Sequence, residues 1–214
     1  GDSRFYYRSL AYSTWPYPNP SFATIELFSY LLTHGLLADD QAAELMTDFD
    51  PRKEKHGSSF SLMKALLKDK GDDWVPSDKL AFFAESYLSK TAKKLNENAL
   101  PEPIFEIIFR KNFDKGFEVL TDYLNLPEKN KDLEQFTDRG FFRILGKSFW
   151  IPDKRDKVVQ LYSSLSESPL FSQIIIDAGL IEELGSSENE QRLKQKLVSS
   201  ETYKIKLERG KKHA

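Results

Sequence analysis

The sequence predicts an all-α protein, an irregular array or bundle of about ten helices. Apolar residues recur at spacings of three and four residues through most of the chain, which is the period of a helix with one buried face. Prolines and small polar residues stand ahead of many of these segments, where they hold the entering backbone extended and satisfy the free amides of a first helical turn. Strand-like patterns are confined to short stretches near the two ends of the chain.

The composition is that of a globular protein with a core of its own. Of the 214 residues, 40% are apolar and 30% are charged. We expect one helical domain over residues 1–214, with a subdomain break near 97–103 or near 127–132. The longest apolar-rich run, 22–37, is interrupted by polar residues, so we expect no membrane-spanning helix.

The first half of the chain carries clear helix start and stop signals. Proline at the first helical position favours a start at Pro20, Gly35 ends the same helix, and Ser77 is a capping residue for the longest one. The helices expected here run over about 20–35, 39–49, 58–67, 77–96, from 101 onward, and 113–127.

In the second half we expect two short helical stretches, around 133–136 and 141–145, and then three longer helices. Asp153, with Asp156 three residues later, resembles a capping box, and Pro169 begins the next helix. Ser187 and Glu190 form a capping box for the last one.

Two segments have the character of strands. Tyr203, Ile205 and Leu207 alternate with lysines, which is a period of two, and Phe5–Tyr12 is rich in aromatic residues. Because a single strand leaves its backbone unpaired, these segments would pair with each other. A small two-stranded element formed by the two ends is therefore an alternative to helix in these places.

The clearest internal pattern links the three tryptophans to helix starts. Trp15, Trp74 and Trp150 each precede a proline-led helix, and a tyrosine follows nine residues after Ser21, Asp78 and Asp153 respectively. Capping and packing at a helix end explain such a pattern, and a duplicated helical unit explains it equally well. If the indoles face solvent, the aromatic residues expected to bind a partner are Trp15, Tyr17, Trp74 and Trp150.

Several classes of chemistry have no signature in the sequence. There is no cysteine, the three histidines have no metal-binding spacing, and no glycine-rich phosphate loop occurs. His34 lies at a helix end, where a cation favours the helix dipole. We therefore assign no catalytic residue, no metal site and no cofactor.

Acidic residues supply an alternative, enzymatic hypothesis. Asp72 and Asp73 beside Trp74 resemble half of a carbohydrate-processing cleft, and Glu102 and Glu106 are one helical turn apart. Two of these acids about 5–9 Å apart in one pocket would favour a hydrolase of a small or carbohydrate substrate. Because Arg110 follows one turn later, we expect Glu102, Glu106 and Arg110 to form an exposed ladder of ion pairs instead.

The leading hypothesis is a non-enzymatic helical module that binds another protein or a peptide in a groove between its helices. The net charge of −2 and the acidic surroundings of the aromatic N-terminal segment argue against a nucleic-acid partner. An exported structural protein or lipoprotein is a further alternative. The chain starts at Gly1 without a methionine, so a leader or lipid anchor removed before residue 1 would leave no trace, and either a cytoplasmic or an exported location is compatible with the sequence.

Overall fold

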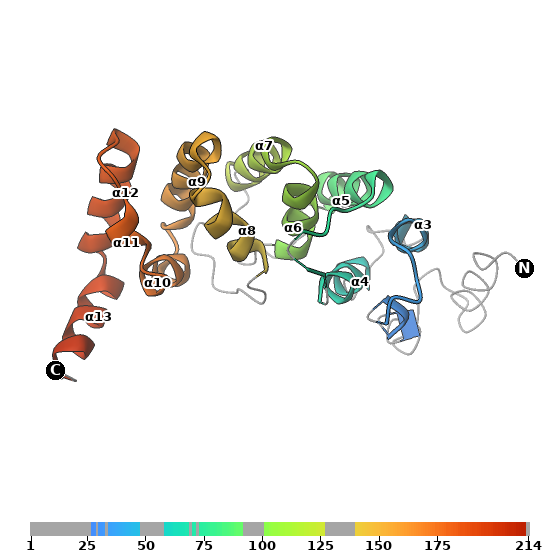
Figure 1. The fold of residues 1–214 in the computed structure, drawn as a ribbon, viewed down its shortest axis with the longest axis horizontal. Coiled ribbons are helices and arrows are strands. Elements are labelled where there is room, and N and C mark those ends of the chain that lie inside the picture. Colours follow the sequence, from blue (N-terminus) through green and yellow to red (C-terminus); the bar gives the residue numbers. More distant parts are fainter. Residues whose placement is uncertain are drawn as a thin grey trace, which may run out of the picture. The chain divides into compact units, whose positions relative to one another are not determined.

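The protein is all-α. The computed structural model describes residues 27–28, 30–32, 34–47, 58–68, 70–71, 73–91, 101–126 and 140–212, and every regular element in these ranges is a helix. Residues 27–28 and 30–32 are helical, and the remaining helices are α3 (Asp39–Thr47), α4 (Ser58–Leu67), α5 (Asp78–Thr91), α6 (Glu102–Lys111), α7 (Phe113–Leu124), α8 (Gly140–Phe149), α9 (Pro152–Leu165), α10 (Pro169–Asp177), α11 (Leu180–Glu183), α12 (Glu188–Ser199) and α13 (Glu201–Lys212) (Figure 1). No helix in the described part of the chain is long and apolar enough to cross a membrane.

The strand alternative is wrong for the C-terminal segment, because residues 203–207 lie inside α13. Ser200 explains the preference for helix, since its hydroxyl oxygen accepts the backbone N–H of Tyr203 at 3.3 Å and caps the first turn. Lys206 then donates to the carbonyl oxygen of Ile176 at 2.7 Å, near the C-terminal end of α10. The other expected strand, Phe5–Tyr12, lies outside the described residues.

The chain divides into two compact units. Unit 1 comprises residues 1–95 and 101–116, and unit 2 comprises residues 96–100 and 117–214, so the division falls within α7.

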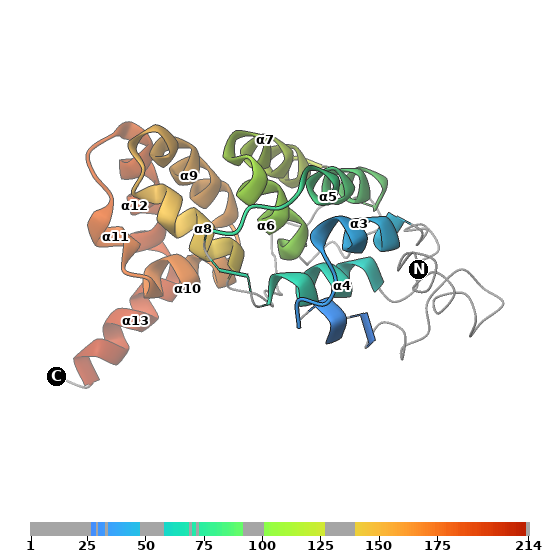
Figure 2. The same ribbon diagram turned by 45° about the vertical axis from the view of Figure 1, so that its right-hand side comes forward.

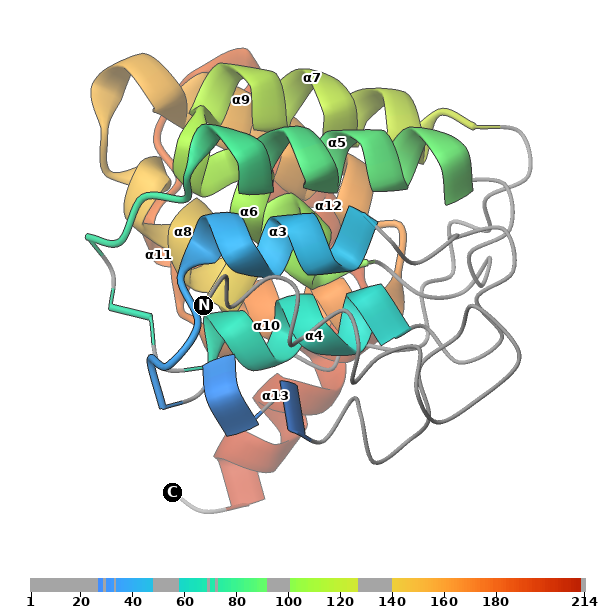
Figure 3. The ribbon, with the colours of Figure 1, turned by 90° about the vertical axis from the view of Figure 1, so that its right-hand side faces the viewer.

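In unit 1, α5 packs against both α3 and α6, and α4 also packs against α6. Figures 2 and 3 show α3, α4 and α5 as neighbouring helices with roughly aligned axes. Every residue of 101–109 is buried, so α6 is the centre of this unit.

The expected exposed ladder of ion pairs on α6 is wrong. Glu102 and Glu106 are 1% and 3% exposed, and the Arg110 side chain is also buried. The charged residues lie on a helix with no solvent face, because α4 and α5 both pack against it. A buried charge is costly unless it is paired, and Arg110 meets this requirement by donating to Glu106 at 2.9 Å.

In unit 2, α9 packs against α8, α10 and α12, while α13 packs against α10 and α12. Lysines from late in the chain close the C-terminal ends of two earlier helices. Lys196 donates to the carbonyl oxygen of Ser163 in the last turn of α9 at 2.8 Å, as Lys206 does at the end of α10. Each lysine therefore brings a charged donor to a carbonyl near a helix C-terminus, a position that favours a cation. The same two oxygens also accept local hydrogen bonds, from the Ser166 hydroxyl at Ser163 and from the Gly179 N–H at Ile176.

The observed helix starts show which of the capping residues predicted from the sequence are correct. Ser77 does cap α5, and Ser187 with Glu190 forms the complete reciprocal capping box of α12. Asp153 is not a cap, because α9 begins one residue earlier with Pro152 at its first position and Ile151 as the capping residue. Proline at the first position already removes one unpaired N–H, so this helix starts without a side-chain cap.

Two helical glycines have opposite surroundings. A Cβ atom at Gly116 in α7 would lie 2.5 to 2.8 Å from ring atoms of Phe109, which is too close for any real contact. A Cβ at Gly146 in α8 would meet nothing within 4 Å. Gly116 therefore permits a close approach of α6 and α7, whereas Gly146 has no such steric role.

We predict that Gly116→Ala lowers the free energy of unfolding by about 1–3 kcal/mol, because the added methyl group must displace a buried ring. Gly146→Ala is the matched control, and it should raise stability by up to about 1 kcal/mol through helix propensity alone. Urea unfolding of the full chain followed by circular dichroism measures both. Equal effects of the two substitutions would show that Gly116 has no packing role.

Candidate functional site

The predicted aromatic anchors that the structure describes differ in how strongly they are exposed to solvent. Trp15 and Tyr17 lie outside the described residues, whereas Trp74 precedes α5 and Trp150 lies between α8 and α9. Trp74 is half-buried and Trp150 is 59% exposed. The two turns therefore present their indoles differently, although their sequences are similar.

Trp74 is fixed inside unit 1 by contacts on its edge and its ring. Its indole N–H donates to a carboxylate oxygen of Asp39 at 3.0 Å, and the other oxygen of Asp39 accepts from Lys70 at 3.1 Å. The Lys70 ammonium lies 4.9 Å from the ring centroid, and the Arg110 guanidinium lies 5.7 Å from it. Trp74 thus links the turn before α5 to α3 and α6, and its polar edge is already bonded.

The same turn is tied to α6 along its backbone. Arg110 donates to the carbonyl oxygen of Gly71 at 2.9 Å, and Lys111 donates to that of Pro76 at 3.2 Å. Lys111 also pairs with Asp78 at 2.6 Å, and this hydrogen bond holds the pKa of that carboxyl below its ordinary value. These contacts give Trp74 a structural role.

Trp150 has a rigid base and a free polar edge. Its ring meets that of Phe149 edge-on, with centroids 5.3 Å apart, and Phe149 is fully buried. Within the part of the chain that the structure describes, the indole N–H has no hydrogen-bond partner. The adjacent Ile151 is 41% exposed, so two large apolar side chains stand side by side in solvent at this turn. We call Trp150 and Ile151 the α8–α9 patch.

Arg155 holds the base of this patch. Its guanidinium lies 4.1 Å from the centroid of the Phe149 ring and donates to Glu190 at 2.7 Å and to the carbonyl oxygen of Glu183 at 2.7 Å. Burial opposes ionisation of Glu190, but hydrogen bonds from Ser187 and Arg155 outweigh it and keep the pKa of this carboxyl below its ordinary value. The turn between α8 and α9 is thereby fastened to the start of α12.

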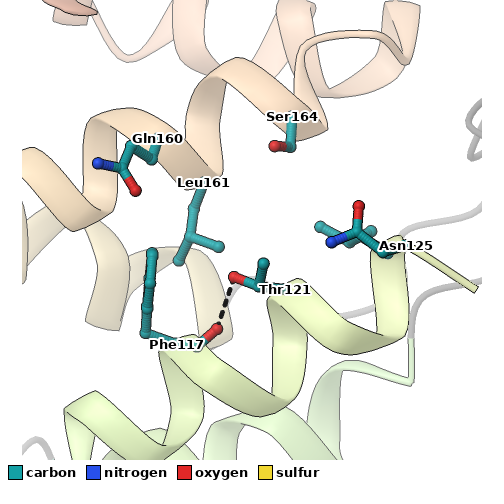
Figure 4. A pocket seen from close by; sticks show the side chains of 7 residues that line it. Phe117, Thr121, Asn125, Gln160, Leu161 and Ser164 are labelled. Carbon is teal, nitrogen blue, oxygen red and sulfur yellow. Dashed lines mark hydrogen bonds between the residues drawn. The ribbon is translucent and has the colours of Figure 1, made fainter.

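A small cavity lies between α7 and α9 in unit 2. Its volume is about 100 Å³, and its lining residues are Phe117, Thr121, Leu124, Asn125, Gln160, Leu161 and Ser164 (Figure 4). The Thr121 hydroxyl donates to the carbonyl oxygen of Phe117 at 2.8 Å, so it is bonded within its own helix. We call this the α7–α9 cavity.

The α7–α9 cavity has an apolar floor and an uncharged polar rim. Leu161 is buried, and Phe117 and Leu124 are partly buried. The side chains of Asn125, Gln160 and Ser164 are exposed and have no hydrogen-bond partner among the described residues. Sequence reasoning missed these three residues, because single polar residues on helix faces are typical of any solvated surface.

The acids of the enzymatic hypothesis do not meet at this cavity, and none of its described lining residues carries a carboxylate. Glu102 and Glu106 are buried in α6, Asp73 is exposed, and Asp72 lies outside the described residues. Among the described residues, no group of three or more acidic or histidine side chains could hold a metal ion. His34 bonds to the carbonyl oxygen of Tyr30 at 2.8 Å near a helix end, where the sequence places it.

The chain matches no protein-family model, and neither curated proteins nor solved structures give a match.

The contact between Arg155 and Glu190 makes a pH-dependent contribution to stability. Because the pKa of folded Glu190 is below its ordinary value of 4.5, ionised Glu190 stabilises the fold above that pH, and the stabilisation is lost as pH falls through the lowered pKa. We predict that Glu190→Gln lowers the free energy of unfolding by about 1–3 kcal/mol at pH 7, and that this difference shrinks as the pH drops below the ordinary value.

Denaturant titrations between neutral and acidic pH measure this difference. Glu188→Gln is the control, because the ion pair between Glu188 and Arg192 is exposed on both sides and should contribute at most about 0.5 kcal/mol. A loss for Glu190→Gln that stayed constant at all pH values would assign the effect to shape rather than to charge.

Proposed function

We propose that this chain is a helical protein that binds another protein, with the α8–α9 patch as the anchor of the contact. The observation that supports the proposal is the exposure of Trp150 and Ile151 on a turn whose base is rigid. Large aromatic residues that carry a polar group are the side chains most enriched among those that dominate binding energy.

The rigidity of the turn that carries Trp150 also supports this proposal. A side chain that is already held in place loses less conformational freedom when a partner binds. Phe149 is fully buried under Trp150, and Arg155 clamps Phe149 from its face. The indole N–H has no partner among the residues described and can donate to a carbonyl of the binding partner, while the ring and Ile151 supply apolar area.

Trp74 gives the contrast within the same chain. Its indole N–H is bonded to Asp39, and two cations lie near its ring. A partner could not hydrogen-bond to its indole N–H or stack on its ring without displacing contacts that hold α3, α5 and α6 together. Of the two described tryptophans, Trp150 is therefore the one that fits the role of an anchor.

The test compares proteins captured from extracts of the native organism by three forms of the full chain and identified by mass spectrometry. The forms are the wild type, Trp150→Ala/Ile151→Ser, and Val75→Ser/Phe82→Ala. Val75 and Phe82 are 59% and 73% exposed, so this pair is a matched control for the loss of exposed apolar area.

We expect one partner to bind the wild type and the control equally and to bind the Trp150 and Ile151 variant at least about 30-fold more weakly, which corresponds to about 2 kcal/mol. Circular dichroism should show the same melting curve for all three proteins. If every captured protein binds all three forms alike, the α8–α9 patch is not a binding surface.

A further inference from the structure

The α7–α9 cavity has the size of one aliphatic side chain rather than of a cofactor. Its volume of about 100 Å³ is well below the range of about 300–1,000 Å³ that is typical of pockets for whole small molecules. Phe117, Leu124 and Leu161 line it with apolar surface. A ligand would therefore place only a small apolar part inside, and the rest would lie along the rim.

The rim offers hydrogen bonds in both directions. The amide groups of Asn125 and Gln160 each carry a donor and an acceptor, and the Ser164 hydroxyl carries both functions in one atom. All three side chains are exposed and have no hydrogen-bond partner in the described ranges. Asn125 directly follows α7, whereas Gln160 and Ser164 lie on α9, so they stand on opposite walls of the cavity (Figure 4). A group that donates and accepts at once, such as a peptide amide, matches this set.

The charge of the lining also restricts the ligand. None of the described residues that line the cavity is acidic, basic or a histidine. The Lys157 ammonium lies outside this lining, 5.6 Å from the ring centroid of Phe117, and has a further partner in the protein. An ammonium group would lose water there and gain no counter-charge from these lining residues, which is unfavourable. A phosphate or a carboxylate would have to draw Lys157 away from the contacts that it already makes. The complementary ligand is therefore uncharged where it meets the cavity.

The spacing along α9 fits an extended chain. Gln160 and Ser164 are four residues apart, which is a rise of about 6 Å along a helix. In an extended peptide, equivalent backbone groups point the same way every second residue, a distance of about 6.6–6.8 Å. One peptide strand lying along α9 can thus meet both side chains and the facing Asn125.

We propose that the α7–α9 cavity binds an extended, uncharged peptide segment, with one aliphatic side chain over Leu161 and with backbone amides bonded to Asn125, Gln160 and Ser164. This deepens the proposed function and rests on it only for the class of partner, a polypeptide. The cavity and the α8–α9 patch have no residue in common, so the two surfaces can be tested separately.

The test uses the full chain labelled with nitrogen-15, in which the side-chain amide signals of Asn125 and Gln160 are observed directly by NMR. The probes are the blocked peptides acetyl-Ala-X-Ala-Ala-amide, with leucine, valine, glycine, glutamate or lysine at X, and isovaleramide as a small amide without a peptide backbone. The protein variants are Asn125→Ala/Gln160→Ala and the control Asn189→Ala/Gln195→Ala, whose replaced residues are exposed on α12.

We expect the leucine and valine peptides to shift both amide signals in a saturable way. The glycine, glutamate and lysine peptides and isovaleramide should bind at least tenfold more weakly. Asn125→Ala/Gln160→Ala should raise the Kd of the leucine peptide at least tenfold, whereas the control variant and Trp150→Ala/Ile151→Ser should leave it unchanged.

Three results would overturn the inference: shifts that do not saturate, equal affinity for the charged peptides, or equal affinity for isovaleramide, which would indicate a site for small neutral molecules. Failure here, together with capture that still depends on Trp150, would reject the cavity and leave the proposed function standing. If the peptides bind but no captured protein depends on Trp150, the proposed function would be rejected and the peptide site at the cavity would stand.

Discussion

In each unit an arginine is bonded at the same time to a glutamate, to a backbone carbonyl and to the face of an aromatic ring. Arg110 bonds to Glu106 and to Gly71 and lies near Trp74, while Arg155 bonds to Glu190 and to Glu183 and lies over Phe149. A guanidinium removed from water needs several acceptors in fixed directions, and its planar fork supplies matching donors. Each arginine therefore fixes an irregular segment that helix propensity alone would leave undetermined.

The different fates of the two described tryptophans follow from what surrounds these arginines. Asp39 at the start of α3 accepts the indole N–H of Trp74, and Lys70 from the segment before Trp74 lies near its ring. Next to Trp150, the Arg155 guanidinium packs against the ring of Phe149 instead. Phe149 is therefore the buried ring that fixes this turn, and the Trp150 indole is left exposed to solvent. The same short pattern of tryptophan and proline thus precedes a structural tryptophan in one unit and an exposed one in the other. The proline also differs in role, since it precedes the capping residue of α5 but occupies the first position of α9.

The sequence predicted what depends on local order along the chain. Helical spacing, Ser77 and the Ser187 capping box identified the fold class and several helix starts, because those signals act within one turn. It could not predict burial of Glu102 and Glu106, since the ion-pair spacing is identical on exposed and buried helices and only the packing of α4 and α5 decides between them. The strand expected at residues 203–207 was wrong for a related reason. An alternating pattern of only five residues favours a strand less strongly than the Ser200 cap and the bond from Lys206 to the end of α10 favour a helix. The α7–α9 cavity had no local signal at all, because its two groups of lining residues are more than thirty positions apart in the sequence.

The distribution of charge in unit 2 bears on how both surfaces would recognise a partner. Arg155, Lys196 and Lys206 are each bonded to backbone carbonyls or to a carboxylate of their own unit, where they close helix ends and fasten turns. These three cations thus stabilise the fold, while the described residues that line the α7–α9 cavity are apolar or carry an amide or a hydroxyl group. Binding at that cavity would owe little to long-range attraction and would change little with salt, in contrast to the steered association of charged surfaces. Selectivity would then come from the shape of the cavity and from the need to bond every amide group buried on binding. An unbonded buried amide costs more free energy than a bonded one contributes, so a wrong ligand is rejected more strongly than the right one is attracted.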